Sequence, residues 1–127
     1  MRKHLAGPLS FFVFFFCAIA AAGCGSSSSG AKFACTNGSG TSQTCIEITA
    51  SSAQAGGVDQ AKMDCTNGGG VASDTCSHVG ADGACKTDLS QNGVTATFTS
   101  WYYSGDATTK ADEMSACTSN GDTWISP

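Results

Sequence analysis

The stretch "QNGVTATFTSWYY" (residues 91–103) decides the fold of this chain. Its Asn92-Gly93 pair lies between two strand-forming runs, and such a pair favours a type I′ turn because both central residues take positive φ. After the turn, successive side chains alternate between two faces. One face carries Val94, Ala96, Phe98 and Tyr102, and the other carries Thr95, Thr97, Thr99, Trp101 and Tyr103. The stretch predicts an antiparallel β-hairpin whose first, more apolar face packs on the core.

A short helix is expected after this hairpin. Beyond Gly105, "DATTKADEMSAC" (106–117) has apolar side chains at helical spacing, and Asp106 or Thr108 is the candidate N-cap. The residues expected to face the sheet are Ala107, Ala111, Met114 and Cys117.

The same order of signals occurs earlier in the chain. "TCIEIT" (44–49) matches the strand, and Val58, Ala61 and Cys65 mark a short helix that begins after Gly56-Gly57. Both helical patterns end in Cys-Thr and a turn, "CTNGGG" (65–70) and "CTSNGD" (117–122). We interpret the two intervals as a duplicated β-β-α unit, and chance similarity in a biased composition is the alternative.

These patterns predict an α+β fold, a small disulfide-rich domain of antiparallel hairpins with one or two short helices. The chain has 127 residues, of which 8 are Cys and 16 are Gly. Its core is small for its length, so disulfides should supply much of the stability.

The chain begins with a segment typical of secretory signal peptides. A basic start is followed by the almost unbroken apolar run "LSFFVFFFCAIAAA" (9–22), which is too short for a comfortable transmembrane helix. We therefore expect a signal peptide at 1–23, a lipidated Cys with a Gly/Ser tether at 24–31, and a disulfide-stabilised domain at 32–127.

Cys24 follows this leader directly and precedes the flexible "GSSSSG". The sequence "AAGC" (21–24) resembles the lipobox of bacterial lipoproteins, although Ala21 stands where Leu is more usual. The resemblance implies that Cys24 is acylated and becomes the mature N-terminus. Loss of Cys17 with the leader and lipidation of Cys24 leave six cysteines, an even number suited to an oxidising compartment. Cleavage nearby with one odd thiol is the alternative.

The charge balance bears on the partners of the mature chain. Loss of the leader removes Arg2 and Lys3, two of the six basic side chains, and none of the ten acidic ones. An acidic chain without Arg lacks the positively charged surface that binds nucleic acid or anionic lipid head groups. Membrane association is therefore expected through the lipid on Cys24.

The motifs "CIE" (45–47) and "CTSNGDTW" (117–124) look like those of small cysteine-patterned lipoproteins of myxobacteria. The likeness spans about half of the chain. The likeness implies an exported, lipid-anchored protein located at the outer membrane or the cell surface. It implies no particular activity.

Six cysteines allow 15 disulfide connectivities. If each unit ties its first strand to the end of its helix, the bridges are Cys35–Cys65 and Cys85–Cys117. Cys45 and Cys76 both lack counterparts in the second unit. The simplest interpretation is that these two cysteines form a disulfide with each other. The rival is local pairing, Cys35–Cys45 and Cys76–Cys85, with Cys65–Cys117 joining the helix ends.

No group of residues in the sequence can be assigned the roles of a catalytic site. His78 is the only histidine after the leader, and it lies in a polar loop where a solvated side chain is expected. The cysteines lack C-x-x-C spacing, and the acids Asp74, Asp82, Asp88 and Asp122 form no calcium-loop motif. We therefore expect no enzyme, no cofactor and no metal.

The second face of the 94–103 run is the candidate binding face: Thr95, Thr97, Thr99, Trp101 and Tyr103. Aromatic rings among hydroxyls suit a carbohydrate or protein ligand. The alternative is that Trp101 and Tyr103 pack under a loop. Two functions remain open, an envelope lipoprotein acting as a non-catalytic binding or structural module, and a small secreted inhibitor or toxin-like effector.

Overall fold

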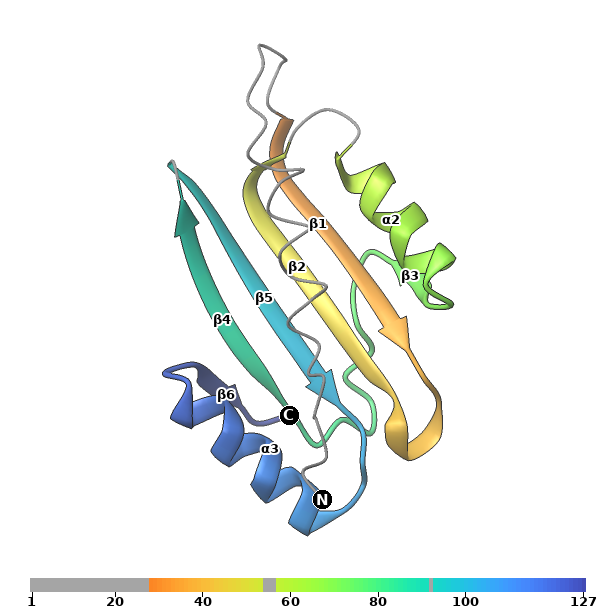
Figure 1. Ribbon diagram of the computed structural model, residues 1–127, viewed down its shortest axis with the longest axis vertical. Coiled ribbons are helices and arrows are strands. Elements are labelled where there is room, and N and C mark those ends of the chain that lie inside the picture. The colour runs from red at the N-terminus through yellow and green to blue at the C-terminus, as the bar shows by residue number, and fades with distance from the viewer. Residues whose placement is uncertain (1–27, 54–56, 92) are drawn as a thin grey trace, which may run out of the picture.

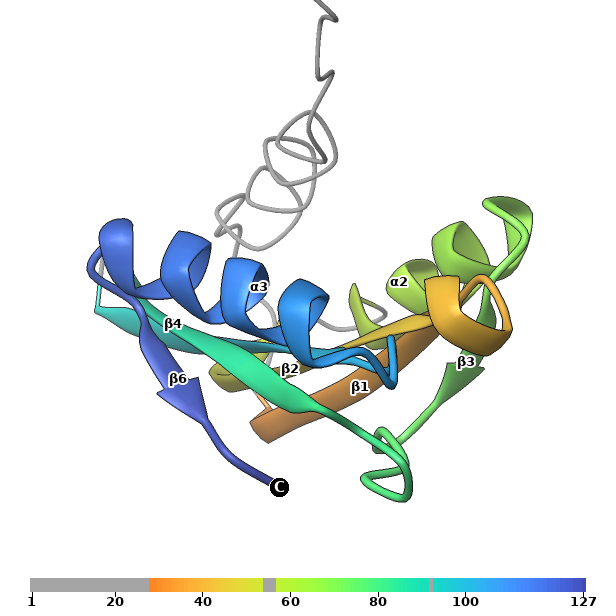
Figure 2. The same ribbon diagram turned by 90° about the horizontal axis from the view of Figure 1, so that it is seen from below.

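The computed structural model describes residues 28–53, 57–91 and 93–127. They form one six-stranded antiparallel sheet with both helices on the same side of it (Figures 1 and 2). The elements are β1 (Ser28–Asn37), the 3-10 helix η1 (Gly40–Ser42), β2 (Thr44–Ala53), α2 (Gly57–Asn67), β3 (Val71–Ser73), β4 (Gly83–Gln91), β5 (Val94–Tyr102), α3 (Ala107–Ser119) and β6 (Thr123–Ile125). The predicted α+β class is confirmed.

The two halves of the domain repeat one order of elements. The strand order is β3-β1-β2-β5-β4-β6, so in each half the second strand is central, the first lies outside it, and the third forms the edge. Each unit is therefore β-β-α-β, one strand longer than the expected β-β-α. The third strands have only three residues each. Such short strands carry no readable periodicity and form by pairing with β1 or β4.

The hairpin of β4 and β5 has the expected place and length. Gln91 pairs with Val94, so two residues make the connection, and Gly93 has a φ of 78°. Positive φ is the conformation for which glycine was expected here. Asn92 lies outside the described residues.

Helix α3 begins where the sequence predicted but presents a different face to the sheet. The Asp106 side chain caps it by accepting a hydrogen bond from the Thr109 backbone N–H at 2.7 Å, which holds the pKa of Asp106 below its ordinary value. Of the four residues expected to face the sheet, Cys117 is buried, whereas Ala107, Ala111 and Met114 are exposed.

The disulfide explains this rotation of α3. Because Cys117 is tied to β4, the positions four and seven residues before it also turn toward the sheet. Those positions hold Glu113 and Lys110, which are partly buried. The α2 pattern is confirmed, since Ala61 and Cys65 are buried and Val58 packs with them.

The domain starts earlier than expected. Ser28 and Ser29 pair with Ala53 and Ser52, so β1 includes the last part of the expected 24–31 tether. The expected signal peptide (1–23) and Cys24 lie outside the described residues.

Candidate functional site

The structure contains the three disulfides of the repeat-based set. They are Cys35–Cys65, Cys45–Cys76 and Cys85–Cys117, with Cα–Cα distances of 5.9, 5.9 and 5.7 Å. The first and third bind each helix to the outer strand of its own hairpin. They therefore fix where α2 and α3 stand on the sheet.

Gly70 allows the chain to leave α2 close to the first of these bridges. A Cβ at this position would lie 2.8 Å from the Cys35 sulfur and 2.9 Å from the Cys65 sulfur. The Gly70 N–H donates a hydrogen bond to the Cys65 carbonyl at 2.9 Å. "TNGGG" is thus the helix end and turn that leads into β3.

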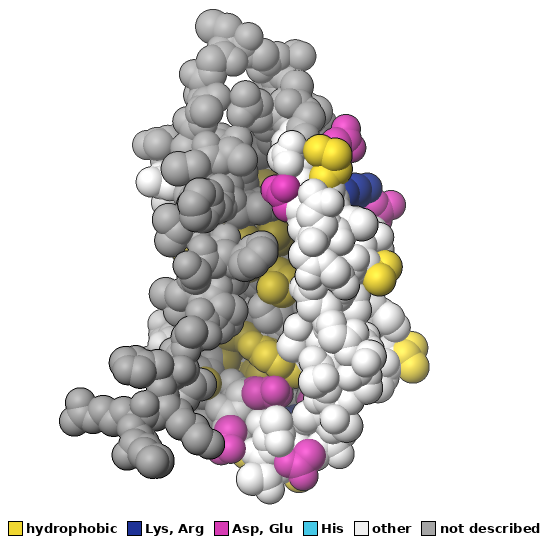
Figure 3. Space-filling model, turned by 45° about the vertical axis from the view of Figure 1, so that its right-hand side comes forward, with side chains coloured by type: hydrophobic (Ala, Val, Ile, Leu, Met, Phe, Trp, Pro, Cys, Tyr) yellow, Lys and Arg dark blue, Asp and Glu magenta, His cyan; other side chains and the backbone are white. Residues whose placement is uncertain are grey.

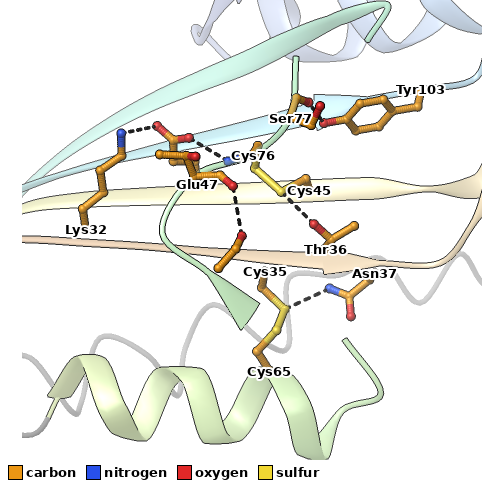
Figure 4. Close-up of a disulfide and its surroundings, with 12 residues drawn as sticks. Lys32, Cys35, Thr36, Asn37, Cys45, Glu47, Cys65, Cys76, Ser77 and Tyr103 are labelled. Carbon is orange, nitrogen blue, oxygen red and sulfur yellow. Dashed lines mark hydrogen bonds and ion pairs between the residues drawn. A yellow bond between two sulfur atoms is a disulfide. The ribbon is translucent and has the colours of Figure 1, made fainter. Parts of the chain in front are cut away.

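The Cys45–Cys76 bridge holds the segment 74–82 against the face of the sheet opposite the helices (Figure 4). The Cys76 N–H donates to Glu47 Oε2 at 3.0 Å, and Lys32 Nζ lies 3.3 Å from Glu47 Oε1. Cys45 and Cys76 are buried in one cluster with Ala34, Ala84 and Trp101. This face therefore has a core of its own.

The candidate binding face must be corrected for its aromatic residues. Trp101 is only 6% exposed, and the His78 ring stacks on it with centroids 3.9 Å apart. Tyr103 is half-buried, and its hydroxyl donates to the Ser77 carbonyl. Both rings pack under the 74–82 loop, which was the alternative stated above. The alternation of side chains along β5 could not predict this burial, because the loop that covers the two rings is held in place by the disulfide of Cys76, which is distant from β5 in the sequence.

The threonines of that face form an ordinary polar surface. Thr95 is exposed, and Thr97 and Thr99 are partly exposed. Thr97 Oγ1 donates to Asp88 Oδ1 at 2.5 Å, and Lys86 Nζ lies 3.1 Å from Asp88 Oδ2. The Thr97 hydroxyl and the charged groups of Asp88 and Lys86 therefore already have partners within the sheet.

The four aspartates weighed for calcium are not brought together. Asp74 pairs with Lys62 at 3.0 Å, and Asp82 accepts hydrogen bonds from Ser104 Oγ and the Gly105 N–H. The bond from Ser104 lowers the pKa of Asp82. Within the described ranges, no group of three or more His, Cys, Asp or Glu side chains could hold a metal ion.

An aromatic and acidic cluster lies around the α3 half of the sheet. The rings of Tyr102 and Trp124 stack with centroids 6.0 Å apart. Burial, then the charges of Glu113 and Asp122, raise the pKa of Tyr102. Burial and the charge of Asp82 raise the pKa of Glu113. In the part of the chain that the structure describes, Glu113 Oε2 and Trp124 Nε1 are buried without a hydrogen-bond partner.

The helix side of the two central strands carries an apolar strip between the helices. In the described part of the chain, α2 lies over β1 and β3, and α3 lies over β4 and β6 (Figure 2). The middle of this face therefore belongs to β2 and β5. We call it the central strip and define it by Ile46, Ile48 and Ala50 of β2 and Ala96 and Phe98 of β5, together with the neighbouring Leu89 of β4. Figure 3 shows hydrophobic side chains gathered on one side of the molecule.

Cross-strand register arranges the strip in rows. One row crosses the sheet through Ala31, Ala50 and Ala96 and ends at Leu89. The next row contains Phe33, Ile48 and Phe98. Three alanines therefore stand side by side in the first row, next to the bulkier second row. Ala50, Ala96 and Phe98 are buried and pack against Ala31, Ile48 and Leu89.

Comparisons with protein-family models, with curated proteins and with solved structures find no match for this chain. No helix among the described residues is long and apolar enough to cross a membrane. The disulfides indicate an extracellular or exported protein.

Proposed function

We propose that this protein is an exported lipoprotein of the bacterial envelope that acts as a non-catalytic binding or structural module. One observation carries the proposal: the six cysteines after Cys24 pair with one another. Cys24 is then not needed for a bridge in the mature domain. A cysteine outside the disulfide framework, next to an apolar leader and a small-residue junction, is best explained as a lipid attachment site.

The lipid is the proposed membrane contact. The mature chain is acidic and has no Arg, so an electrostatic attachment to anionic lipids is unfavourable. Several acyl chains at one N-terminus give the stable anchoring that one chain does not. A rigid, three-disulfide domain held at the outer membrane or cell surface is suited to binding or structural support.

The test compares wild-type protein with Cys24→Ser in the producing bacterium. Wild-type protein should incorporate radiolabelled palmitate and sediment with membranes. Cys24→Ser should incorporate none, and it should be released or remain an uncleaved precursor. Ser26→Ala, in the same tether, is the matched control and should behave as wild type.

Unchanged membrane partitioning of Cys24→Ser would contradict the lipoprotein proposal. The secreted inhibitor or effector would instead be found unlabelled in the soluble fraction for wild type and both variants. The intact mass of the mature chain separates these outcomes independently.

A further inference from the structure

We propose that Met63 and Met114 are sites of reversible oxidation, at which a peroxide converts each thioether to a sulfoxide while the domain stays folded. Met63 belongs to α2 and Met114 to α3, so each helix carries one site. Methionine sulfoxide reductases are the class of enzyme that reverses this modification. The inference concerns the folded domain and does not depend on the proposed lipid.

The disulfides leave these two thioethers as the oxidisable sulfur of the described domain. The six cysteines of the described residues are bonded in pairs, so none of them has a free thiol. Oxidation of cysteine by a peroxide starts from the thiolate, which a disulfide does not have. The remaining methionine of the chain, Met1, lies outside the described residues. A peroxide that meets the domain is therefore expected to react at Met63 and Met114.

Both methionine side chains are open to solvent. Met63 is 54% exposed and Met114 is 42% exposed, whereas Phe98 in the sheet is 3% exposed. Neither methionine belongs to the three buried hydrophobic clusters of the described residues. A peroxide in solution can therefore reach both side chains without unfolding of the domain.

The helix bridges explain why the methionines are exposed. Cys65 is buried against the sheet, and each residue of a helix is turned about 100° from the one before it. Met63, two positions earlier, therefore points to the opposite side of α2. On α3 the bridge of Cys117 turns Glu113 toward the sheet, which leaves Met114 in solvent. The helical pattern alone predicted a protected Met114, so only the structure assigns it as reactive.

The reaction is a two-electron oxygen transfer. A lone pair of the thioether sulfur attacks one oxygen of the peroxide, and the S–O bond forms as the O–O bond breaks. The proton of the attacked hydroxyl passes to the leaving oxygen, which departs as water or as an alcohol. The sulfur is oxidised and the peroxide is reduced by the same two electrons. The product is a polar sulfoxide, which disrupts a core but is solvated on a helix surface.

The experiment treats the full mature protein, isolated from the producing bacterium, with dilute hydrogen peroxide. Samples are quenched over time, digested without reduction and mapped by mass spectrometry. Each methionine should gain one oxygen at a rate within about threefold of its rate in denatured protein. The three disulfide-linked peptides should be unchanged, and the melting temperature should stay within about 2 °C of the untreated value. Reductases specific for each sulfoxide epimer should then remove the oxygen.

Two variants provide matched controls. Phe98→Met adds a thioether at a buried position, and this thioether should oxidise at least about tenfold more slowly than Met63 in the same molecule. Met114→Leu keeps the size of the side chain and should lose one of the two oxygen additions. The comparison of folded with denatured wild-type protein needs no variant, so it decides the question even if Phe98→Met does not fold.

Three results would overturn the inference. The first is oxidation of either methionine at least about tenfold more slowly in the folded than in the denatured protein, because the side chain would then be protected. The second is loss of cooperative melting after oxidation, because the thioether would then pack in the core. The third is a sulfoxide that the reductases repair only after unfolding. None of these results bears on the lipid at Cys24.

Discussion

The indole ring of Trp124 lies over Gly83. A Cβ at Gly83 would collide with Trp124 Cζ2, so no side chain can stand there without moving the indole. The two residues belong to neighbouring strands, since β6 pairs with β4 through Ala84–Lys86. The missing side chain lets Trp124 extend toward Tyr102, on which it stacks. This contact joins the C-terminal edge strand to the centre of the sheet.

Gly83→Ala should therefore destabilise the domain. Overpacking of this kind typically costs about 1–3 kcal/mol, because the ring or the backbone must shift. Urea denaturation followed by tryptophan fluorescence measures the free energy of unfolding. Gly57→Ala is the matched control, because no atom lies within 4 Å of a Cβ at that position. Equal stability of the two variants would show that Trp124 does not depend on Gly83.

The three disulfides should contribute nearly equally to stability. Their sequence separations are 30, 31 and 32 residues, and closing such loops is worth roughly 3–4 kcal/mol each in the chain-entropy model. The double variants Cys35→Ala/Cys65→Ala and Cys85→Ala/Cys117→Ala should each lose about that amount. Chemical denaturation of the two variants and the wild type gives the comparison.

Peptide mapping without reduction checks the connectivity directly. Wild-type protein should yield the three linked peptides of the structure. A peptide pair that links Cys35 to Cys45 would contradict both the connectivity and the repeat on which it was predicted.

Glu113 should make the stability of the domain depend on pH. Burial and the charge of Asp82 raise its pKa in the folded state, so the folded protein binds this proton more tightly than the unfolded chain does. Protonation of Glu113 therefore favours folding. Its contribution is unfavourable at neutral pH, where the carboxylate is ionised, and is relieved as the pH falls through the raised pKa.

Glu113→Gln removes this unfavourable ionisation. The variant should be more stable than wild type at pH 7, and the difference should shrink as the pH approaches the ordinary range for Glu. Melting temperatures between pH 4 and pH 8 measure the effect, with the exposed Asp112→Asn on the same helix as the control. A stability difference that is the same at every pH would mean that the ionisation of Glu113 is not its cause.

Much of the fold could be predicted because its signals are local. The Asn92-Gly93 pair, the alternation after it and the Asp106 cap each depend on residues a few positions apart, and the structure has strands and a helix at these places. The disulfide connectivity depends on contacts between residues far apart in the chain. The repeat nevertheless predicted it, because Cys45 and Cys76 are the two cysteines without a counterpart in the second unit and are therefore expected to bond to each other. The assignment of Cys24 as a lipid site rests on the leader and stays a prediction.

The sequence by itself determined the β-β-α order within each unit and the place of the 91–94 turn, and its repeat favoured the disulfide set that the structure contains over the local rival. Only the tertiary structure decided which face of α3 meets the sheet, that Trp101 is buried, and that β3 and β6 extend the sheet. The physical reason is the same in each case. The Cys117 bridge sets the rotation of α3, the Cys76 bridge brings a loop over Trp101, and pairing with β1 and β4 creates the short edge strands. These contacts join residues that are far apart in the chain, and the periodicity of side chains along the sequence cannot predict such contacts.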